Sequence, residues 1–229
     1  MELNLSGEDR LLFENDACLV INKLAGESSE QLTAGAEKLF PAHRLDVPVT
    51  GCLLLARNPV AAAFLGKAFA EGRQVKKLYW AIVEKSKAAE SLALRGELVH
   101  RLGFSGKTNK TFAVTANIDS EEKRLKKAAL RYRVTGQGDH YLFLEVELVT
   151  GRHHQIRAQL AAVGLHIKGD LKYGARRSEK GGGIRLHARS LSFPNPLNPA
   201  ETIRAQAPPP RMDSLWTSFV NGFLSDDTQ

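Results

Sequence analysis

Cysteine is scarce in this chain, which has only Cys18 and Cys52 among its 229 residues. The two lie far apart, each within an apolar run, so their spacing fits neither a disulfide framework nor a cysteine metal site. We predict that both are small buried hydrophobic side chains. Such cysteine usage is typical of a reducing compartment.

Long apolar runs are absent as well. No stretch approaches the roughly 20 apolar residues that a membrane-spanning helix needs. The opening sequence MELNLSGEDR lacks the positive and apolar regions of a secretory signal. The sequence therefore predicts a cytoplasmic protein with no membrane partner.

Several common catalytic motifs are also missing. The chain has no Gly-x-x-x-x-Gly-Lys-Ser/Thr loop, no Gly-x-Gly-x-x-Gly after its first strand, no His-Glu-x-x-His or Cys-x-x-Cys metal motif and no Gly-x-Ser-x-Gly elbow. The adjacent His153 and His154 should point in different directions on a helix, which disfavours joint metal binding. We therefore expect chemistry without a metal or a cofactor.

Positive charge, in contrast, is in excess. The 32 lysines and arginines against 25 acidic residues give a net charge of +7 and a pI near 9.5. Such an excess favours phosphate-rich partners, because each neutralised phosphate releases counterions. Charge alone leaves open an ordinary, mildly basic globular protein. The charged run 120–127 is predicted to be a solvated loop.

Apolar periodicity predicts an α+β fold, because strand-rich and helical pieces alternate without a repeated strand–helix unit. Helices are expected from Pro59 to Gly72, from about Ile156 to Gly164, and over about 210–224. Strands are expected at 17–23, 52–57, 78–83, 95–100, 110–118, 128–135, 141–149, 184–193 and 202–207.

The most informative motif is His43-Arg44-Leu45-Asp46. Its carboxylate lies beside cationic residues and shortly before the apolar strand that begins at Cys52. Cationic surroundings keep such a carboxylate ionised and nucleophilic. In a basic chain, this combination indicates an enzyme that acts on a polyanion.

The same motif, continued through Gly51 to Arg57, resembles the catalytic motif of the RluA-type pseudouridine synthases. Further segments resemble that family in order and spacing: Phe13 to Lys23, Lys77 to Ala81, Thr150 to Arg157, Ile167 to Gly174 and Leu186 to Pro196. The resemblance covers about residues 11–207. It implies a pseudouridine synthase fold, with a mixed, mostly antiparallel central sheet flanked by helices.

The resemblance implies three catalytic residues. Asp46 matches the aspartate that initiates cleavage of the uridine glycosidic bond, and Tyr79 matches the tyrosine that lies against the target uracil. Arg157 matches the arginine that pairs with the aspartate, and a fixed guanidinium would keep that acid ionised. The implied reaction isomerises a specific uridine of ribosomal or transfer RNA, with no metal and no cofactor.

RNA contacts are expected around these three residues. Arg44 matches a residue that can enter the gap left by an extruded base. The other predicted RNA-binding residues are His43, Lys77, Arg152, His154 and Lys172. Further candidates for phosphate contact are Arg73, Lys76, Arg101, Lys107, Lys110, Lys126, Lys127, Arg176 and Arg177.

Each assignment has a plainer alternative. Asp46 could cap a turn, Tyr79 could be a half-buried strand aromatic, and Arg157 could be a helix-surface cation. The chain also has Val49-Thr50-Gly51 where the family usually has Thr-Ser-Gly. This departure motivates a second hypothesis, a non-catalytic RNA-binding protein or RNA chaperone on the same fold. A DNA-binding protein without chemistry is a weaker third.

We expect a single catalytic domain over 1–229, with its core at about 11–207 and a C-terminal helix at about 210–224. The S4 RNA-binding module of some relatives has no room before residue 11, so the choice of RNA should depend on the catalytic domain. A monomer is expected, because a large RNA must enter an open site.

Overall fold

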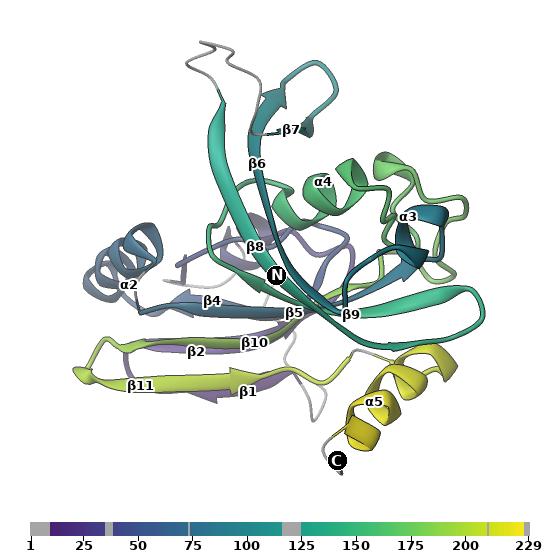
Figure 1. Cartoon of the computed structure of the whole chain (residues 1–229). Coiled ribbons are helices and arrows are strands. Elements are labelled where there is room, and N and C mark those ends of the chain that lie inside the picture. Colours follow the sequence, from purple (N-terminus) through teal and green to yellow (C-terminus); the bar gives the residue numbers. More distant parts are fainter. Residues whose placement is uncertain (1–9, 35–38, 73, 116–124, 210, 227–229) are drawn as a thin grey trace. The chain divides into compact units, whose positions relative to one another are not determined.

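The computed structural model describes residues 10–34, 39–72, 74–115, 125–209 and 211–226. Its contacts divide the chain into two compact units. The first unit contains Met1–Tyr79 and His187–Arg211, and the second contains Trp80–Leu186 and Met212–Gln229. Each unit has its own strands and helices (Figure 1). The expectation of a single domain therefore stays a prediction.

The first unit is built on mixed strands. Its strands are β1 (Leu11–Glu14), β2 (Cys18–Lys23), β3 (Phe40–Pro41), β4 (Thr50–Ala56), β10 (Leu186–Asn195) and β11 (Asn198–Gln206). They are ordered β1-β2-β4-β10, with β3 beside β4 and β11 beside β10. β10 pairs with β4 in parallel, while the other described pairings in this unit are antiparallel.

Helix α2 (Pro59–Glu71) follows β4, and local rules set both of its ends. The side chain of Asn58 accepts a hydrogen bond from the Ala61 amide at 2.9 Å, and Pro59 lies in the first turn. Gly72 ends the helix in left-handed backbone at φ 70°. The predicted helix from Pro59 to Gly72 is confirmed. The shorter helix α1 (Ser29–Ala34) was not predicted.

The apolar core of the first unit explains the unbroken hydrophobic runs in its sequence. Every residue of β2 and of β4 is buried, as expected for strands covered on both faces. Cys18 and Cys52 lie in this core, 0% and 1% exposed, and form no disulfide. Burial raises the pKa of their thiols to about 11 and about 12. The prediction that both are buried hydrophobic side chains is confirmed.

Gly51 lies where β4 meets β10. Its φ is +110°, and an added Cβ would lie 2.3 Å from the carbonyl oxygen of Ala188. Only glycine suits both this backbone conformation and this close approach. Because Gly51 is at the start of β4, the contact fixes where the preceding loop, which carries Asp46, joins the strand.

The second unit has antiparallel strands in the order β9-β8-β6-β7. They are β6 (Arg95–Ser105), β7 (Lys110–Thr115), β8 (Lys126–Gln137) and β9 (Tyr141–Leu148). Its helices are α3 (Lys87–Glu90), α4 (Gln155–Ala162), the 3₁₀ turn η1 (Leu171–Tyr173) and α5 (Ser214–Asp226). β6 and β8 are long neighbouring strands, and α4 lies against β7 (Figure 1). The strand β5 (Lys76–Glu84) begins in the first unit and ends in the second.

Helix α5 packs its aromatic side chains inside the second unit. Trp216 and Phe219 are buried in a cluster with Trp80 and Phe143. At the start of the helix, the carboxylate of Asp213 accepts a hydrogen bond from the Trp216 amide at 3.2 Å. This helix was predicted at about 210–224, and the structure has it at Ser214–Asp226.

The fold-class prediction is confirmed, because the chain combines mixed, mostly antiparallel strands with flanking helices. Two details differ. β8 already begins at Lys126, inside the run 120–127 that was predicted to be a loop; residues 120–124 lie outside the described residues. The predicted directions of the two histidine side chains are wrong: His153 and His154 precede α4, their ring centroids lie 3.7 Å apart in a stack, and His154 has left-handed backbone at φ 50°. Within the described residues, no helix has the length and apolarity to cross a membrane.

Candidate active site

The loop between β3 and β4 carries Asp46 and is anchored at several points. The Ser29 hydroxyl accepts a hydrogen bond from the Leu45 amide at 3.2 Å and lies 3.3 Å from the Leu45 carbonyl oxygen. The carbonyl oxygen of Asp46 accepts from the Val49 amide at 2.9 Å. Asp46 is half-buried, whereas Leu45 and Val49 are buried. The acid is therefore presented between two anchored neighbours.

Lys23, the last residue of β2, is a buried cation beside this loop. Its ammonium donates to the carbonyl oxygens of Leu24 and Glu27 at 2.8 Å each and of Val47 at 3.2 Å. Its exposed fraction is 0%. Burial lowers its pKa to about 8, against the opposing effect of the carboxylates of Glu27 and Asp46. We did not predict a role for Lys23, although it follows the unbroken strand that opens the family-like segment.

Tyr79 lies in β5 and is 8% exposed. Burial raises the pKa of its phenol, and the charges of Asp46 and Cys52 raise it further. The phenol is therefore neutral at physiological pH, and it lies close enough to Asp46 to be affected by that charge. Within the first unit, the structure thus brings together two of the three predicted catalytic residues.

His43 and Arg44, which precede Asp46, differ in their surroundings. Nε2 of His43 accepts a hydrogen bond from the Leu54 amide at 3.1 Å, and the ring stacks on Phe69 at 4.7 Å. Burial, with the nearby charge of Lys77, lowers the His43 pKa to about 3, so the imidazole is neutral. Arg44 is exposed and lies 3.8 Å from Glu30. His43 thus holds the loop against β4, and RNA binding by either residue stays a prediction.

Lys77 lies at the start of β5 in the same unit. Its ammonium is 5.8 Å from the centre of the Phe69 ring, on which His43 also stacks. Burial lowers the pKa of Lys77. A cation over an aromatic face retains its hydrogen-bond donors, so this geometry is compatible with a phosphate contact.

Arg157 lies on α4 in the second unit and is 4% exposed. Its Nε and Nη2 donate to the two carboxylate oxygens of Asp170 at 2.6 and 2.8 Å. Its guanidinium carbon lies 4.8 Å from the centre of the Tyr173 ring. The alternative of a helix-surface cation is therefore wrong for Arg157. Its predicted pairing with Asp46 stays a prediction.

The turn before α4 carries His154 and Arg152. Nδ1 of His154 lies 2.9 Å from the Tyr173 hydroxyl, and burial lowers the His154 pKa to about 3, with Arg157 acting in the same direction. The backbone amide of Arg152 donates to the side-chain oxygen of Gln155 at 3.0 Å, and Arg152 is exposed. Lys172 is exposed and donates to the Asn109 carbonyl oxygen at 2.5 Å. RNA binding by these residues stays a prediction.

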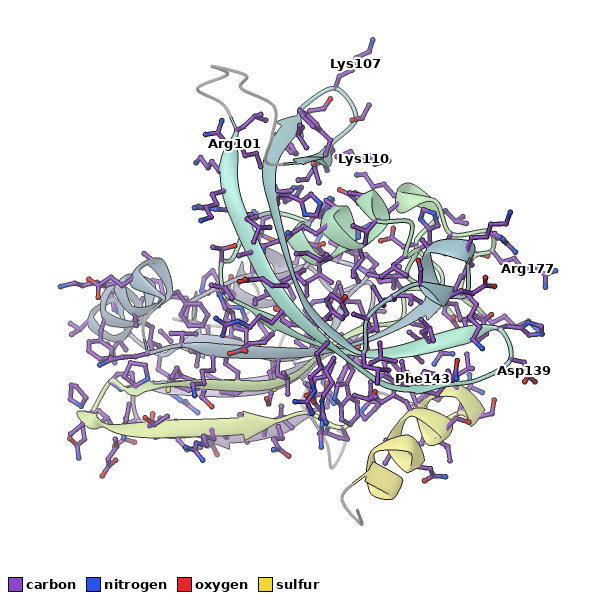
Figure 2. All side chains as sticks on the ribbon, viewed as in Figure 1. Arg101, Lys107, Lys110, Asp139, Phe143 and Arg177 are labelled. Carbon is purple, nitrogen blue, oxygen red and sulfur yellow. The ribbon has the colours of Figure 1, made fainter. Side chains whose placement is uncertain are left out.

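Basic side chains also gather on the β6–β7 hairpin and the start of β8. Arg101, Lys107 and Lys110 of the hairpin are labelled in Figure 2. Arg101 lies opposite Lys127 in the strand register. The other exposed candidates are Lys76, Lys126, Arg176 and Arg177, while Arg73 lies outside the described residues.

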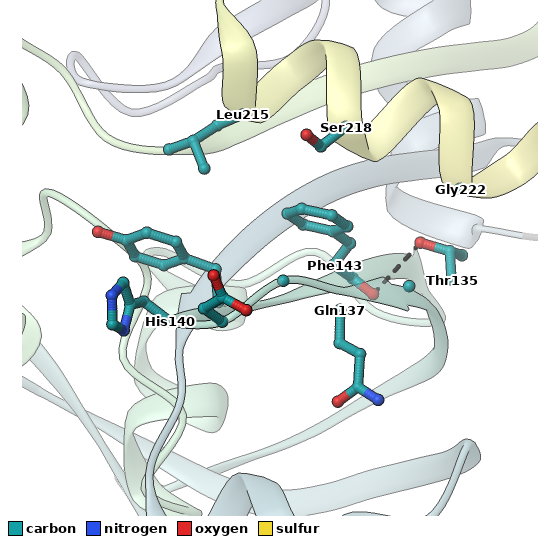
Figure 3. A pocket seen from close by; sticks show the side chains of 11 residues that line it. Thr135, Gln137, His140, Phe143, Leu215, Ser218 and Gly222 are labelled. Carbon is teal, nitrogen blue, oxygen red and sulfur yellow. Dashed lines mark hydrogen bonds between the residues drawn. The ribbon is translucent and has the colours of Figure 1, made fainter.

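A separate pocket of about 570 Å³ lies in the second unit, between the β8–β9 turn and α5 (Figure 3). It is lined by residues 135–141, Phe143, Leu215, Ser218 and Gly222. The Thr135 hydroxyl donates to the Phe143 carbonyl oxygen at 3.2 Å along its wall. None of the predicted site residues lines this pocket. Among the described residues, no cluster of three or more His, Cys, Asp or Glu side chains could hold a metal ion.

Comparison with known families identifies the class of protein. A family model described as RNA pseudouridylate synthase matches residues 15–162. The matched region contains Asp46, Tyr79 and Arg157. The chain therefore belongs to the RNA pseudouridylate synthase family and is an RNA pseudouridine synthase, an isomerase.

Individual relatives are similar to most of this chain. An uncharacterized RNA pseudouridine synthase of Zymomonas mobilis is 31% identical over 222 residues, covering 88% of this chain and 94% of that protein. tRNA pseudouridine synthase C of Haemophilus ducreyi is 30% identical, covering 93% and 95%. Ribosomal large subunit pseudouridine synthase C of Yersinia pestis is 30% identical, covering 87% of this chain and 65% of that protein. Human RNA pseudouridylate synthase domain containing 1 has the same fold, with a TM-score of 0.72 at 24% identity over 90% of this chain and 85% of that chain.

Proposed function

We propose that this protein isomerises a uridine of ribosomal or transfer RNA to pseudouridine, with Asp46 as the acid that initiates the reaction. The observation that carries the proposal is the position of Asp46, which lies between the anchored Leu45 and Val49 in the same unit as the buried phenol of Tyr79. A carboxyl group near a buried aromatic ring suits a reaction in which a nucleobase must be held flat while its glycosidic bond breaks.

The reaction balances within one nucleoside. The bond from N1 of uracil to C1′ breaks, the detached base rotates, and a bond from C5 to C1′ forms. The proton on C5 leaves to solvent, and N1 gains one. No electrons are exchanged with an outside partner, so the chain needs no redox group for this step. Asp46 acts by adding to the sugar, adding to the base or removing the 2′ proton.

Tyr79 and Arg157 have supporting roles in this proposal. The raised pKa of Tyr79 keeps its proton in place, so the ring can stack on uracil and its hydroxyl can donate or relay a hydrogen bond. Arg157 would supply a permanent positive charge to pair with Asp46, since a guanidinium does not titrate in proteins.

The RNA would be held by the exposed cations. Arg44 is 66% exposed at its side chain and paired only at 3.8 Å with an equally exposed Glu30, a contact that costs little to break. It can therefore enter a gap left by an extruded uridine. In the second unit, Arg152, His154, Lys172 and the β6–β7 hairpin would contact RNA, and in the first unit His43 and Lys77 would do so. We propose a monomer that acts in the cytoplasm, where ribosomal and transfer RNA are found.

The decisive experiment is tritium release from 5-tritiated uridine in ribosomal and transfer RNA. Asp46→Asn should reduce release by about 1,000-fold or more, because an amide cannot act as nucleophile or base, yet RNA binding should remain. The matched control is Asp16→Asn, the same chemical change at an exposed acid of the same unit, which should release tritium at the wild-type rate.

Two results would contradict the proposal. Wild type that binds RNA and releases no tritium would favour the non-catalytic alternative, which no relative's name supports. An Asp46→Asn variant that keeps wild-type release would remove Asp46 from the chemistry. Mapping pseudouridines in cells with and without the gene would identify the RNA and the position.

A further inference from the structure

The guanidinium of Arg157 is held by two residues that motif reasoning did not assign. Asp170 engages Nε and Nη2 through the two short hydrogen bonds described above, and the Tyr173 ring lies beside the guanidinium carbon. Asp170 is 1% exposed and Tyr173 is 4% exposed. We propose that Asp170 is a positioning residue, which fixes the guanidinium of Arg157 for the reaction. This inference rests on the proposed function.

The pairing geometry explains why Asp170 would control direction as well as charge. A bidentate pair between a carboxylate and the Nε–Nη2 edge fixes the plane of a guanidinium. The edge that carries Nη1 then points in one fixed direction. A pairing through a single hydrogen bond would leave the group free to turn about its long side chain. Asp170 thus sets where the permanent charge of Arg157 is presented.

Tyr173 completes the support from the same short turn. Its hydroxyl oxygen accepts a hydrogen bond from the Thr111 amide at 2.9 Å and lies 2.9 Å from Nδ1 of His154. The ring is therefore anchored to β7 and to the turn before α4. Its own amide donates to the Asp170 carbonyl oxygen at 2.9 Å. One turn therefore delivers both the carboxylate and the ring to Arg157.

The glycines around this turn explain its compact form. Gly169 and Gly174 flank it with φ of +90° and +95°, which L side chains rarely adopt. An added Cβ at Gly174 would lie 2.8 Å from the ring of His166. The segment Gly169-Asp170 to Tyr173-Gly174 can thus be understood as a support for Arg157.

The second unit offers a matched control at another aspartate–arginine pair. Asp213 pairs with Arg185 through both carboxylate oxygens, and the Arg185 guanidinium lies 5.8 Å from the centre of the Trp216 ring. The chemistry resembles that around Arg157, yet this pair anchors α5. Asp213→Asn therefore makes the same chemical change as Asp170→Asn, but in an ion pair that supports the structure.

The test measures the single-turnover rate at saturating RNA and, separately, the Kd for RNA. Asp170→Asn should lower the rate by about 100-fold, because a misdirected group loses much of its effect, while the Kd stays within about 2-fold. In an Arg157→Lys background, Asp170→Asn should have little further effect, since both changes act through one group. Asp213→Asn should lower the melting temperature and leave the rate within about 2-fold of wild type.

The inference fails if Asp170→Asn turns over at the wild-type rate, or if its effect simply multiplies that of Arg157→Lys. Should Asp170→Asn not fold, Tyr173→Phe decides. This variant keeps the ring and loses the anchoring hydroxyl. A several-fold decrease in rate that is absent in the Arg157→Lys background supports the inference. A wild-type rate overturns it. A wild-type enzyme without product would instead contradict the proposed function.

Discussion

Two buried cations, one in each unit, are held in opposite ways. Lys23 in the first unit points its ammonium at three backbone carbonyl oxygens, next to the loop of Asp46. Arg157 in the second unit has a dedicated carboxylate, Asp170, and an aromatic ring, Tyr173. Both side chains are almost fully buried, yet only Arg157 has a formal counter-charge in direct hydrogen-bond contact among these described partners.

The different hydrogen-bond partners determine how the charge of each cation depends on pH. Carbonyl oxygens carry only partial charge, so they compensate burial incompletely, and the pKa of Lys23 falls to about 8. A guanidinium with a bidentate carboxylate stays charged at every accessible pH. Lys23 therefore provides a charge that depends on pH near Asp46, whereas Arg157 provides one that does not.

The largest expected effect comes from breaking the Arg157 pair. Arg157→Met leaves the Asp170 carboxylate buried without its counter-charge, which should lower the free energy of unfolding by about 3–5 kcal/mol. The double variant Arg157→Met with Asp170→Leu removes both charges and should recover most of the loss. Urea unfolding at pH 7 measures both values. A single variant that loses less than about 1 kcal/mol would show that the pair is not the tight, buried one described here.

A smaller effect, and one that depends on pH, is expected at Lys23. Its pKa is about 8 in the folded chain and 10.5 in the unfolded chain, so the unfolded chain binds more protons between these values. Stability then rises with pH through this interval, by roughly 2–3 kcal/mol from this group. Lys23→Met should remove that rise.

The comparison with Lys23→Met is needed because other groups titrate in the same interval. The thiols of Cys18 and Cys52 have raised pKa values in the folded chain, so the unfolded chain loses protons first and stability falls above about pH 9. Subtracting the variant's pH profile from that of wild type cancels this contribution. A difference that stays flat from pH 7 to pH 10.5 would mean that Lys23 does not titrate there.

Local patterns predicted what depends on local physics. The Asn58 cap, Pro59 and Gly72 set the ends of α2, and short apolar runs predicted β2 and β4. Asp46, Tyr79 and Arg157 were predicted as catalytic residues because the segments that carry them resemble those of the family in order and spacing.

Hydrogen-bond partners on the backbone of other segments could not be predicted from the sequence. Three carbonyl oxygens hold Lys23, and carbonyl oxygens exist at every position, so no sequence pattern identifies those of Leu24, Glu27 and Val47. The rings of His153 and His154 stack, and His154 has a positive φ although it is not glycine; sequence periodicity predicts neither feature.

The smallest effect is expected from a change at Glu27, a neighbour of Lys23. The charge of Glu27 raises the pKa of Lys23. The carboxylate of Glu27 also accepts hydrogen bonds from Arg10 and from the Leu24 amide, and the side-chain oxygen of a glutamine could accept such bonds as well. Glu27→Gln should therefore lower the Lys23 pKa further, so that the rise of stability begins at lower pH, with a change below about 1 kcal/mol at pH 8. The same urea profiles measure it against Lys23→Met. No shift, or a shift to higher pH, would mean that the charge of Glu27 does not raise the pKa of Lys23.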